Sequence, residues 1–208
     1  AVAVAGIVLG LTAAPAAACG GLVAPNGAVR LLRTSTLAAY HDGVEHYVTS
    51  FQFAGDGADV STDGPKEFGS IVPLPGVPTS VERGGDWTLQ RLSREVTPQL
   101  DFANLSAASA GTTAKRTSAT VLLETRIDAL DITGLRGGAR AVGQWATDHG
   151  FRLPPDAPDA LDFYADRSPI FLAAVFDADA AAQRGQAIGD GTPVHVTIPT
   201  DNPWVPLR

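Results

Sequence analysis

The sequence predicts an α+β fold, in which an antiparallel or mixed β-sheet carries two or three helices packed on one face. Segments rich in β-branched and aromatic residues occur in both halves of the chain, and stretches with helical spacing lie between them. The order of these segments is strands, helix, strand, helix, short helix and strands, which is typical of an α+β fold. A hydrophobic content of 45% with 18% charged residues is typical of a chain that folds.

The clearest local signal is a β-hairpin in the stretch TLAAYHDGVEHYVTSFQF. Its Asp42-Gly43 pair favours a two-residue type I′ turn, and runs suited to strands flank it on both sides. Pairing outward from the turn places His41 and His46 on one face. The aromatic residues expected on the opposite, core-facing side are Tyr47, Phe51 and Phe53.

Several other segments have strand composition. AVRLLRTS precedes the hairpin, and EFGSIVPLPGVPTSVE follows it. Pro73, Pro75 and Pro78 remove backbone donors from this second segment, which indicates a sheet edge or a strand exit. The later strand segments are TVLLETRIDALDITGL, IFLAAVFDA and PVHVTIP, with DADAAAQRGQAIGDGT as the connection between the last two.

Three segments have helical signals. GGDWTLQRLSREVTP offers Asp86 as an N-cap and Pro98 as a stop, and PPDAPDALDFYADRSP reads as a short capped helix. GGARAVGQWATDHGF is a helix that Gly150 closes in the C′ position. The residues that share one face of it are Val142, Trp145, Ala146 and His149.

The first eighteen residues are uncharged and largely apolar. They predict a signal peptide over residues 1–18, truncated at its start, before a single extracytoplasmic α+β domain over residues 19–208. Ala16 and Ala18 are the small residues that a signal peptidase requires, and cleavage after Ala18 would leave Cys19 as the mature N-terminus. Lipidation of Cys19 and retention of the leader as an anchor are the alternatives.

The charge balance excludes one class of partner. Fifteen basic and 22 acidic residues give a net charge of −7, and no basic run is longer than Lys115-Arg116. Because nucleic-acid binding depends on basic patches, no nucleic-acid partner is predicted. Association with a membrane is expected, through the leader, a lipid or a helix beyond Arg208.

No common catalytic or cofactor motif occurs in the sequence, so no catalytic residue, metal site or cofactor is predicted. Of the four histidines, His41, His46, His149 and His195, only the first two are expected to lie near each other. Two imidazoles alone make an incomplete zinc site. His149 fits a structural role in the last turn of its helix. An acidic loop lacks the EF-hand spacing, although it contains Asp56, Asp59 and Asp63.

Several segments together resemble a known family: ACGG, HDGVEHYVTSFQF, FGSIVPLPGVP, LDITGLRGGARAVGQWATDHGFRLP, LDFYADRSPIFLAAVF and WVPLR. The chain resembles, from about Cys19 to Arg208, the bacterial extracytoplasmic proteins classed as domain of unknown function 2330. The resemblance implies a signal peptide, and in many members a C-terminal hydrophobic helix, but it transfers no catalytic residue.

The expected function is that of a non-enzymatic, extracytoplasmic and membrane-associated module, which binds a ligand or belongs to the cell envelope. The alternative is an enzyme of unfamiliar type that uses Cys19 or the His41/His46 face.

Overall fold

The structure, a computed structural model, describes residues 21–23, 29–55, 67–85, 89–91, 119–186 and 191–207. It confirms the α+β class: the strand pairs are all antiparallel, and helices cover one sheet face. Several predictions lie outside the described residues, namely the leader with Ala16, Ala18 and Cys19, and the acidic loop with Asp56, Asp59 and Asp63. Of the helix predicted between Asp86 and Pro98, only residues 89–91 are described, and they are helical.

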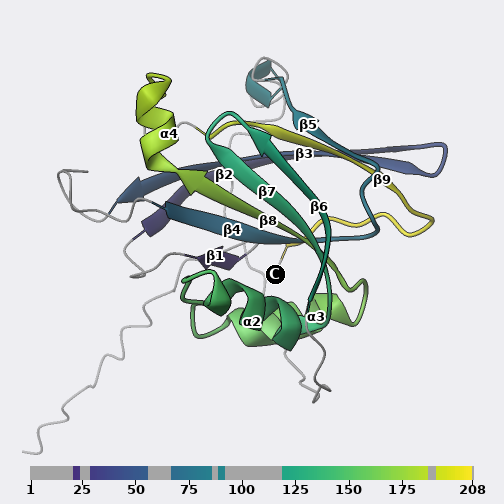
Figure 1. Cartoon of the computed structure of the whole chain (residues 1–208). Helices are drawn as coiled ribbons and strands as arrows, with labels where there is room; N and C mark the ends of the chain where they lie inside the picture. Colours follow the sequence, from purple (N-terminus) through teal and green to yellow (C-terminus); the bar gives the residue numbers. More distant parts are fainter. Residues whose placement is uncertain are drawn as a thin grey trace, which may run out of the picture.

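The described strands form two sheets rather than the one that was expected. The five-stranded sheet has the order β1 (Gly21–Val23), β4 (Glu67–Leu74), β8 (Ile170–Asp177), β7 (Leu130–Arg136) and β6 (Thr120–Ile127). The four-stranded sheet has the order β2 (Val29–His41), β3 (Val44–Gly55), β9 (Val194–Pro199) and β5 (Ser80–Arg83). Figure 1 shows the two sheets stacked one above the other.

The main core lies between the two sheets. Tyr47 from β3 and Val196 from β9 are buried against Leu172 of β8 and Ile132 of β7. Alternation along β9 explains this burial, because every second residue of a strand points to the same face. The two sheets therefore form a sandwich closed by their inward-facing side chains.

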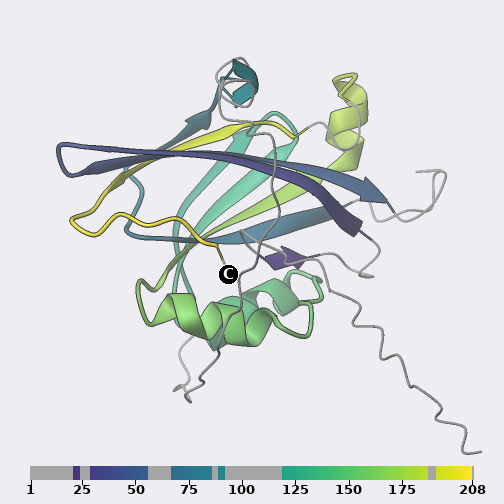
Figure 2. The same cartoon turned by 180° about the vertical axis from the view of Figure 1, so that it is seen from behind.

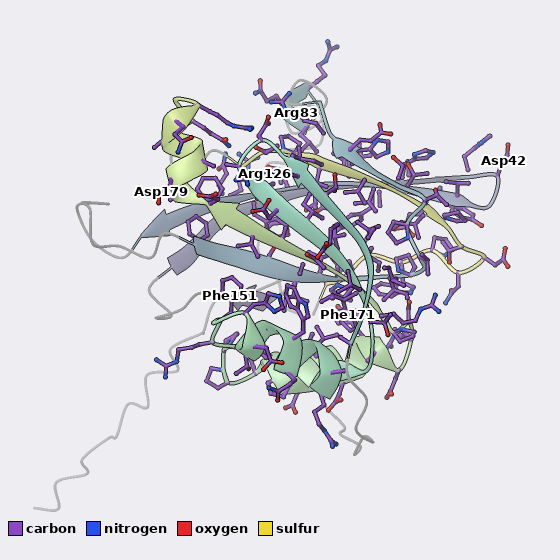
Figure 3. The ribbon with its side chains drawn as sticks, in the orientation of Figure 1. Asp42, Arg83, Arg126, Phe151, Phe171 and Asp179 are labelled. Carbon is purple, nitrogen blue, oxygen red and sulfur yellow. The ribbon has the colours of Figure 1, made fainter. Side chains whose placement is uncertain are left out.

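A second core lies on the outer face of the five-stranded sheet, beneath the helices α2 (Ala139–Asp148) and α3 (Ala157–Ala165). Val142 and Ala146 of α2 are buried with Phe171 of β8. Figure 3 shows Phe151 and Phe171 between the sheet and this helix layer. The described molecule thus has three layers: a four-stranded sheet, a five-stranded sheet and a pair of helices.

The predicted hairpin is confirmed residue by residue. Asp42 and Gly43 have φ angles of 50° and 78°, both in the left-handed region that a type I′ turn needs. His41 pairs with Val44, and Tyr47 is buried in the main core, as expected. The helix expected to end at Gly150 is also confirmed as α2, and Gly150 has a φ of 81°.

Two connections differ from the sequence interpretation. The stretch TVLLETRIDALDITGL is two strands, β6 and β7, joined by a tight turn in which Asp128 has a φ of 54°. The connection after β8 contains a short helix, α4 (Ala178–Gln183), which was not predicted. The Asp177 side chain caps this helix, because its Oδ1 accepts a hydrogen bond of 2.9 Å from the Ala180 N–H. In Figures 1 and 2, α4 and β5 stand at the opposite end of the molecule from α2 and α3.

The C-terminal segment after β9, residues 200–207, connects the layers. Trp204 N donates to Glu45 Oε2 of β3 at 3.1 Å, and Leu207 N donates to the Tyr164 hydroxyl of α3 at 2.8 Å. The Trp204 ring also stacks on Tyr164, with ring centroids 5.4 Å apart. Figure 2 shows this yellow segment running from the upper sheet toward the helix layer. Within the described part of the chain, no helix is long and apolar enough to cross a bilayer.

Candidate functional site

A cleft among the described residues lies where β9 begins. β3 pairs with β9 only from Val44 to Thr49, although β3 itself runs on to Gly55. The hairpin of β2 and β3 therefore extends past the start of β9, and the cleft opens beside this extension. Its volume is about 780 Å³, a size that suits a small molecule or part of a chain-like ligand.

Polar side chains dominate the described lining of this cleft. Two cross-strand pairs of the β2–β3 hairpin contribute, Arg33 with Gln52 and Ser35 with Ser50. Residues from five other described segments complete the lining: Arg83, Leu89, Gln90, Asp128, Arg184, Gln186, Gly191, Thr192 and Pro193. We call this set the arginine cleft.

One carboxylate holds two of the three arginines of the arginine cleft. Arg83 Nε, at the end of β5, donates to Asp128 Oδ2 at 2.8 Å. Arg184 Nη1, just after α4, lies 3.7 Å from Asp128 Oδ1. Asp128 occupies the turn between β6 and β7, so it ties the two sheets and α4 together at this end of the sandwich. Figure 3 shows Arg83 at the top of the molecule, far from Phe151 and the helix layer.

The position of α4 depends on a second ion pair. Arg126 Nη2 of β6 donates to Asp177 Oδ2 at 2.7 Å, while the other oxygen of Asp177 caps the helix. The hydrogen bond from the Ala180 N–H lowers the pKa of Asp177, and the Arg126 guanidinium lowers this pKa further. This pair fixes the helix after which Arg184 enters the arginine cleft.

A glycine is required at position 191, because the backbone there lies very close to the backbone of Phe51 in β3. A Cβ atom at this position would overlap the carbonyl oxygen of Phe51 in β3. The absence of a side chain lets the segment before β9 lie directly against the hairpin and form the wall of the arginine cleft. No sequence signal other than the glycine itself indicated this contact.

The charge of the arginine cleft is opposite to that of the whole chain. The chain carries a net charge of −7, whereas the described lining has three arginines and one aspartate, a net charge of +2. Because Asp128 contacts both Arg83 and Arg184, it neutralises only part of their combined charge. A concave surface with this excess attracts anions.

The histidines do not lie as the sequence suggested. His46 Nδ1 lies 3.1 Å from His195 Nε2, within hydrogen-bond distance, so the expectation that only His41 would lie near His46 is wrong. His41 is exposed at the end of the hairpin and contacts its neighbour Asp42, with Nδ1 3.2 Å from Oδ2. The pairing of β3 with β9 brings His195 to His46 from 149 residues away.

His149 occupies the position that was expected, and Glu45 lies on the opposite face of β3 from His46. Glu45 points away from His46 into the molecule, where its side chain is 1% exposed. Burial raises the pKa of Glu45 above its usual value, and the hydrogen bond from Trp204 N opposes this shift. His149 lies at the end of α2, with Nδ1 2.7 Å from the Trp145 carbonyl oxygen and its ring stacked on that indole.

The described residues hold no group of three or more His, Cys, Asp or Glu side chains arranged to bind a metal ion. Fold and site together define a three-layer α+β protein with an open cleft at one end of a β-sandwich, whose described lining carries more arginine than aspartate. The sequence from residue 13 to residue 208 matches the family described as "Uncharacterized protein conserved in bacteria", DUF2330. The chain therefore belongs to this bacterial family, as its segments indicated.

Other comparisons add little. A search of curated proteins gives no match. Among solved structures, the crystal structure of baculovirus P35 is similar, with a TM-score of 0.45 and 12% sequence identity. The match covers 84% of this chain and 56% of the baculovirus chain. This degree of similarity does not establish a common fold.

Proposed function

We propose that the chain is a non-enzymatic binding module of the bacterial cell envelope, extracytoplasmic and membrane-associated, which takes an anionic, hydroxyl-rich ligand in the arginine cleft. The observation that carries this proposal is the arginine cleft, whose described lining has a net charge of +2 on a chain of net charge −7. Support for the location comes from the uncharged, apolar stretch before Cys19, which has the composition of a leader.

The chemistry of the lining indicates the ligand class. Arginine forms paired hydrogen bonds with carboxylate and phosphate groups, because its guanidinium is planar and presents several donors. Gln52, Gln90 and Gln186 offer amide groups that both donate and accept, which suits hydroxyl groups. Acidic saccharides combine these two features.

The anchoring of the arginines supports binding as well. Asp128 fixes the Arg83 side chain through a short hydrogen bond, so this side chain has already lost part of its conformational entropy before a ligand binds. The entropy cost of binding is smaller for this reason. Arg33 lines the same cleft from the neighbouring β2–β3 hairpin. A ligand with two acidic groups could therefore contact Arg33 and Arg184 from one bound position.

Calorimetric titration tests the binding proposal. We expect acidic oligogalacturonate to bind, and neutral maltooligosaccharide of equal length to bind at least about ten-fold more weakly, since only the former pairs with arginine. Arg33→Gln and Arg184→Gln should each lower the affinity for the acidic saccharide by roughly ten-fold, and added salt should lower this affinity further. Arg152→Gln is the matched control, because this exposed arginine follows Phe151 in the helix layer.

Two results would overturn the binding proposal. One is equal affinity for the acidic and the neutral saccharide. The other is equal loss of affinity in Arg152→Gln and Arg184→Gln.

The location is tested separately, by intact-mass measurement of the protein from its native host after cell fractionation. A mass that starts at Cys19 with added diacylglycerol identifies a lipid anchor, and an unmodified start there identifies secretion. A retained leader in the membrane fraction identifies an uncleaved anchor. Recovery of the intact chain, leader included, from the cytoplasm contradicts the proposed location.

A further inference from the structure

The outward face of the four-stranded sheet carries a pair of histidines that the arginine cleft does not include. His46 lies on β3 and His195 on β9, and both are half-buried. Their rings are tilted by 33°, with centroids 5.3 Å apart. The shortest approach, 3.1 Å, joins His46 Nδ1 to His195 Nε2, so the nitrogen edges of the two rings face each other.

We propose that His46 and His195 bind a divalent transition-metal ion of the zinc class. Neutral imidazole nitrogen is a preferred ligand of zinc, copper and nickel. Two nitrogens at about 2.0–2.1 Å from a tetrahedral ion are separated by about 3.3 Å, and by about 2.9 Å where the angle at the ion is a right angle. The observed 3.1 Å falls between these values, so an ion needs only a small movement of either ring.

The present contact between the rings is compatible with metal entry. One ring must donate an N–H to the other, because two lone pairs at this distance repel. Within the described part of the chain, neither ring makes a hydrogen bond to another residue. A cation that enters between the two nitrogens breaks this single hydrogen bond, and the N–H proton moves through water to the other nitrogen of the same ring. Both neutral imidazoles then present a lone pair to the ion.

The remaining coordination positions are open to water and to one nearby carboxylate. Glu82 of β5 lies directly opposite His195 in the strand pairing. In the metal-free arrangement its Oε1 accepts a hydrogen bond of 2.7 Å from the Ser80 hydroxyl, and the described residues hold no ready-made cluster of three ligands. The two imidazoles are thus the primary ligands, and a rotation of the exposed Glu82 side chain would add a third.

Zinc titration of the whole chain tests the site. We expect wild-type protein to bind zinc, and His46→Gln and His195→Gln each to lose roughly ten-fold or more in affinity at this site, because either change removes one of two protein ligands. The double variant, which lacks both imidazoles, should bind zinc at this site more weakly than either single variant. His149→Gln serves as the control, since His149 contacts the Trp145 carbonyl and ring instead of a second histidine.

A residue-level readout separates this site from any other zinc ligands in the chain. Zinc should slow the modification of His46 and His195 by diethyl pyrocarbonate, measured by mass spectrometry, and leave His41 and His149 unaffected. The fold is retained where the thermal unfolding curve of each variant, recorded without zinc, coincides with that of wild type. Unchanged zinc affinity in both single variants, or equal protection of all four histidines, would overturn the proposal. Neither readout depends on the saccharide binding proposed above.

Discussion

Glu45 shows how one buried residue can make stability depend on pH. Its Oε2 accepts the Trp204 N–H, while its Oε1 is buried with no hydrogen-bond partner among the described residues. A half-satisfied buried carboxylate is costly when charged, since desolvation is incompletely compensated. Glu45 therefore resists ionisation inside the fold.

Glu45→Gln should change the pH dependence of stability. Burial raises the folded-state pKa of Glu45. The contribution of the protonated side chain to the free energy of unfolding is therefore complete below the ordinary pKa of 4.5, and it is lost as the pH rises through the raised pKa. Glutamine keeps an acceptor for Trp204 N and carries no charge. We expect the free energy of unfolding of the variant to rise relative to that of wild type as the pH increases above 4.5, measured by urea denaturation.

Thr49→Val controls for this experiment, because Thr49 is buried on the same strand and does not titrate. Its free-energy difference from wild type should stay constant over the same pH range. If Glu45→Gln behaves in the same way, ionisation of Glu45 does not limit stability.

At the scale of elements, local chemistry predicted some parts and could not predict others. The hairpin follows from Asp42-Gly43, which needs no distant partner. The contact of His46 with His195 needs the β3–β9 pairing, and alternation along a strand shows which face a residue takes but not which strand lies beside it. The division into two sheets escaped prediction for the same reason.

The arginine cleft shows the same limit, because Arg83 ends β5, Asp128 lies in the β6–β7 turn and Arg184 follows α4. The helix α4 is different: its signals were present. Asp177 is a good N-cap, an alanine-rich run follows it, and Gly185 adopts a φ of 66° just after the helix. A six-residue helix has too few turns for periodicity to reveal it.

Asp177→Ala should destabilise the protein by about 1 kcal/mol, because the change removes the cap of α4 together with the Arg126 contact. The pKa of Asp177 is lowered in the folded protein. The contribution of its carboxylate to the free energy of unfolding is therefore present above the ordinary pKa of 3.8, and it is lost as the pH falls through the lowered pKa. The difference from wild type in urea unfolding should therefore shrink in acid.

Asp201→Asn, at an exposed position after β9, is the control and should stay within about 0.5 kcal/mol of wild type. Asp177 caps α4, and Arg184 directly follows this helix. Asp177→Ala should therefore also lower the affinity for the acidic saccharide. Retained affinity would mean that α4 does not position Arg184.

At the scale of the whole molecule, the C-terminal segment connects layers that have separate cores. Trp204 packs against the core beneath the helices, whereas Val205 packs against the core between the sheets. The hydrogen bonds of Trp204 N and Leu207 N reach β3 and α3 respectively. Contacts of this kind favour cooperative unfolding of all three layers.

Trp204→Ala should lower the free energy of unfolding by about 2–3 kcal/mol, because it removes the stacking on Tyr164 and a partly buried indole. Tyr164→Phe keeps the ring and removes the hydroxyl that accepts from Leu207 N, so a loss of about 1 kcal/mol is expected. Leu207→Ala retains its backbone N–H and alters a side chain that is 71% exposed, so it should be nearly neutral. Urea unfolding followed by circular dichroism and by tryptophan fluorescence measures all three variants. A Leu207→Ala loss as large as that of Trp204→Ala would show that the segment stabilises the layers through contacts other than Tyr164 and Glu45.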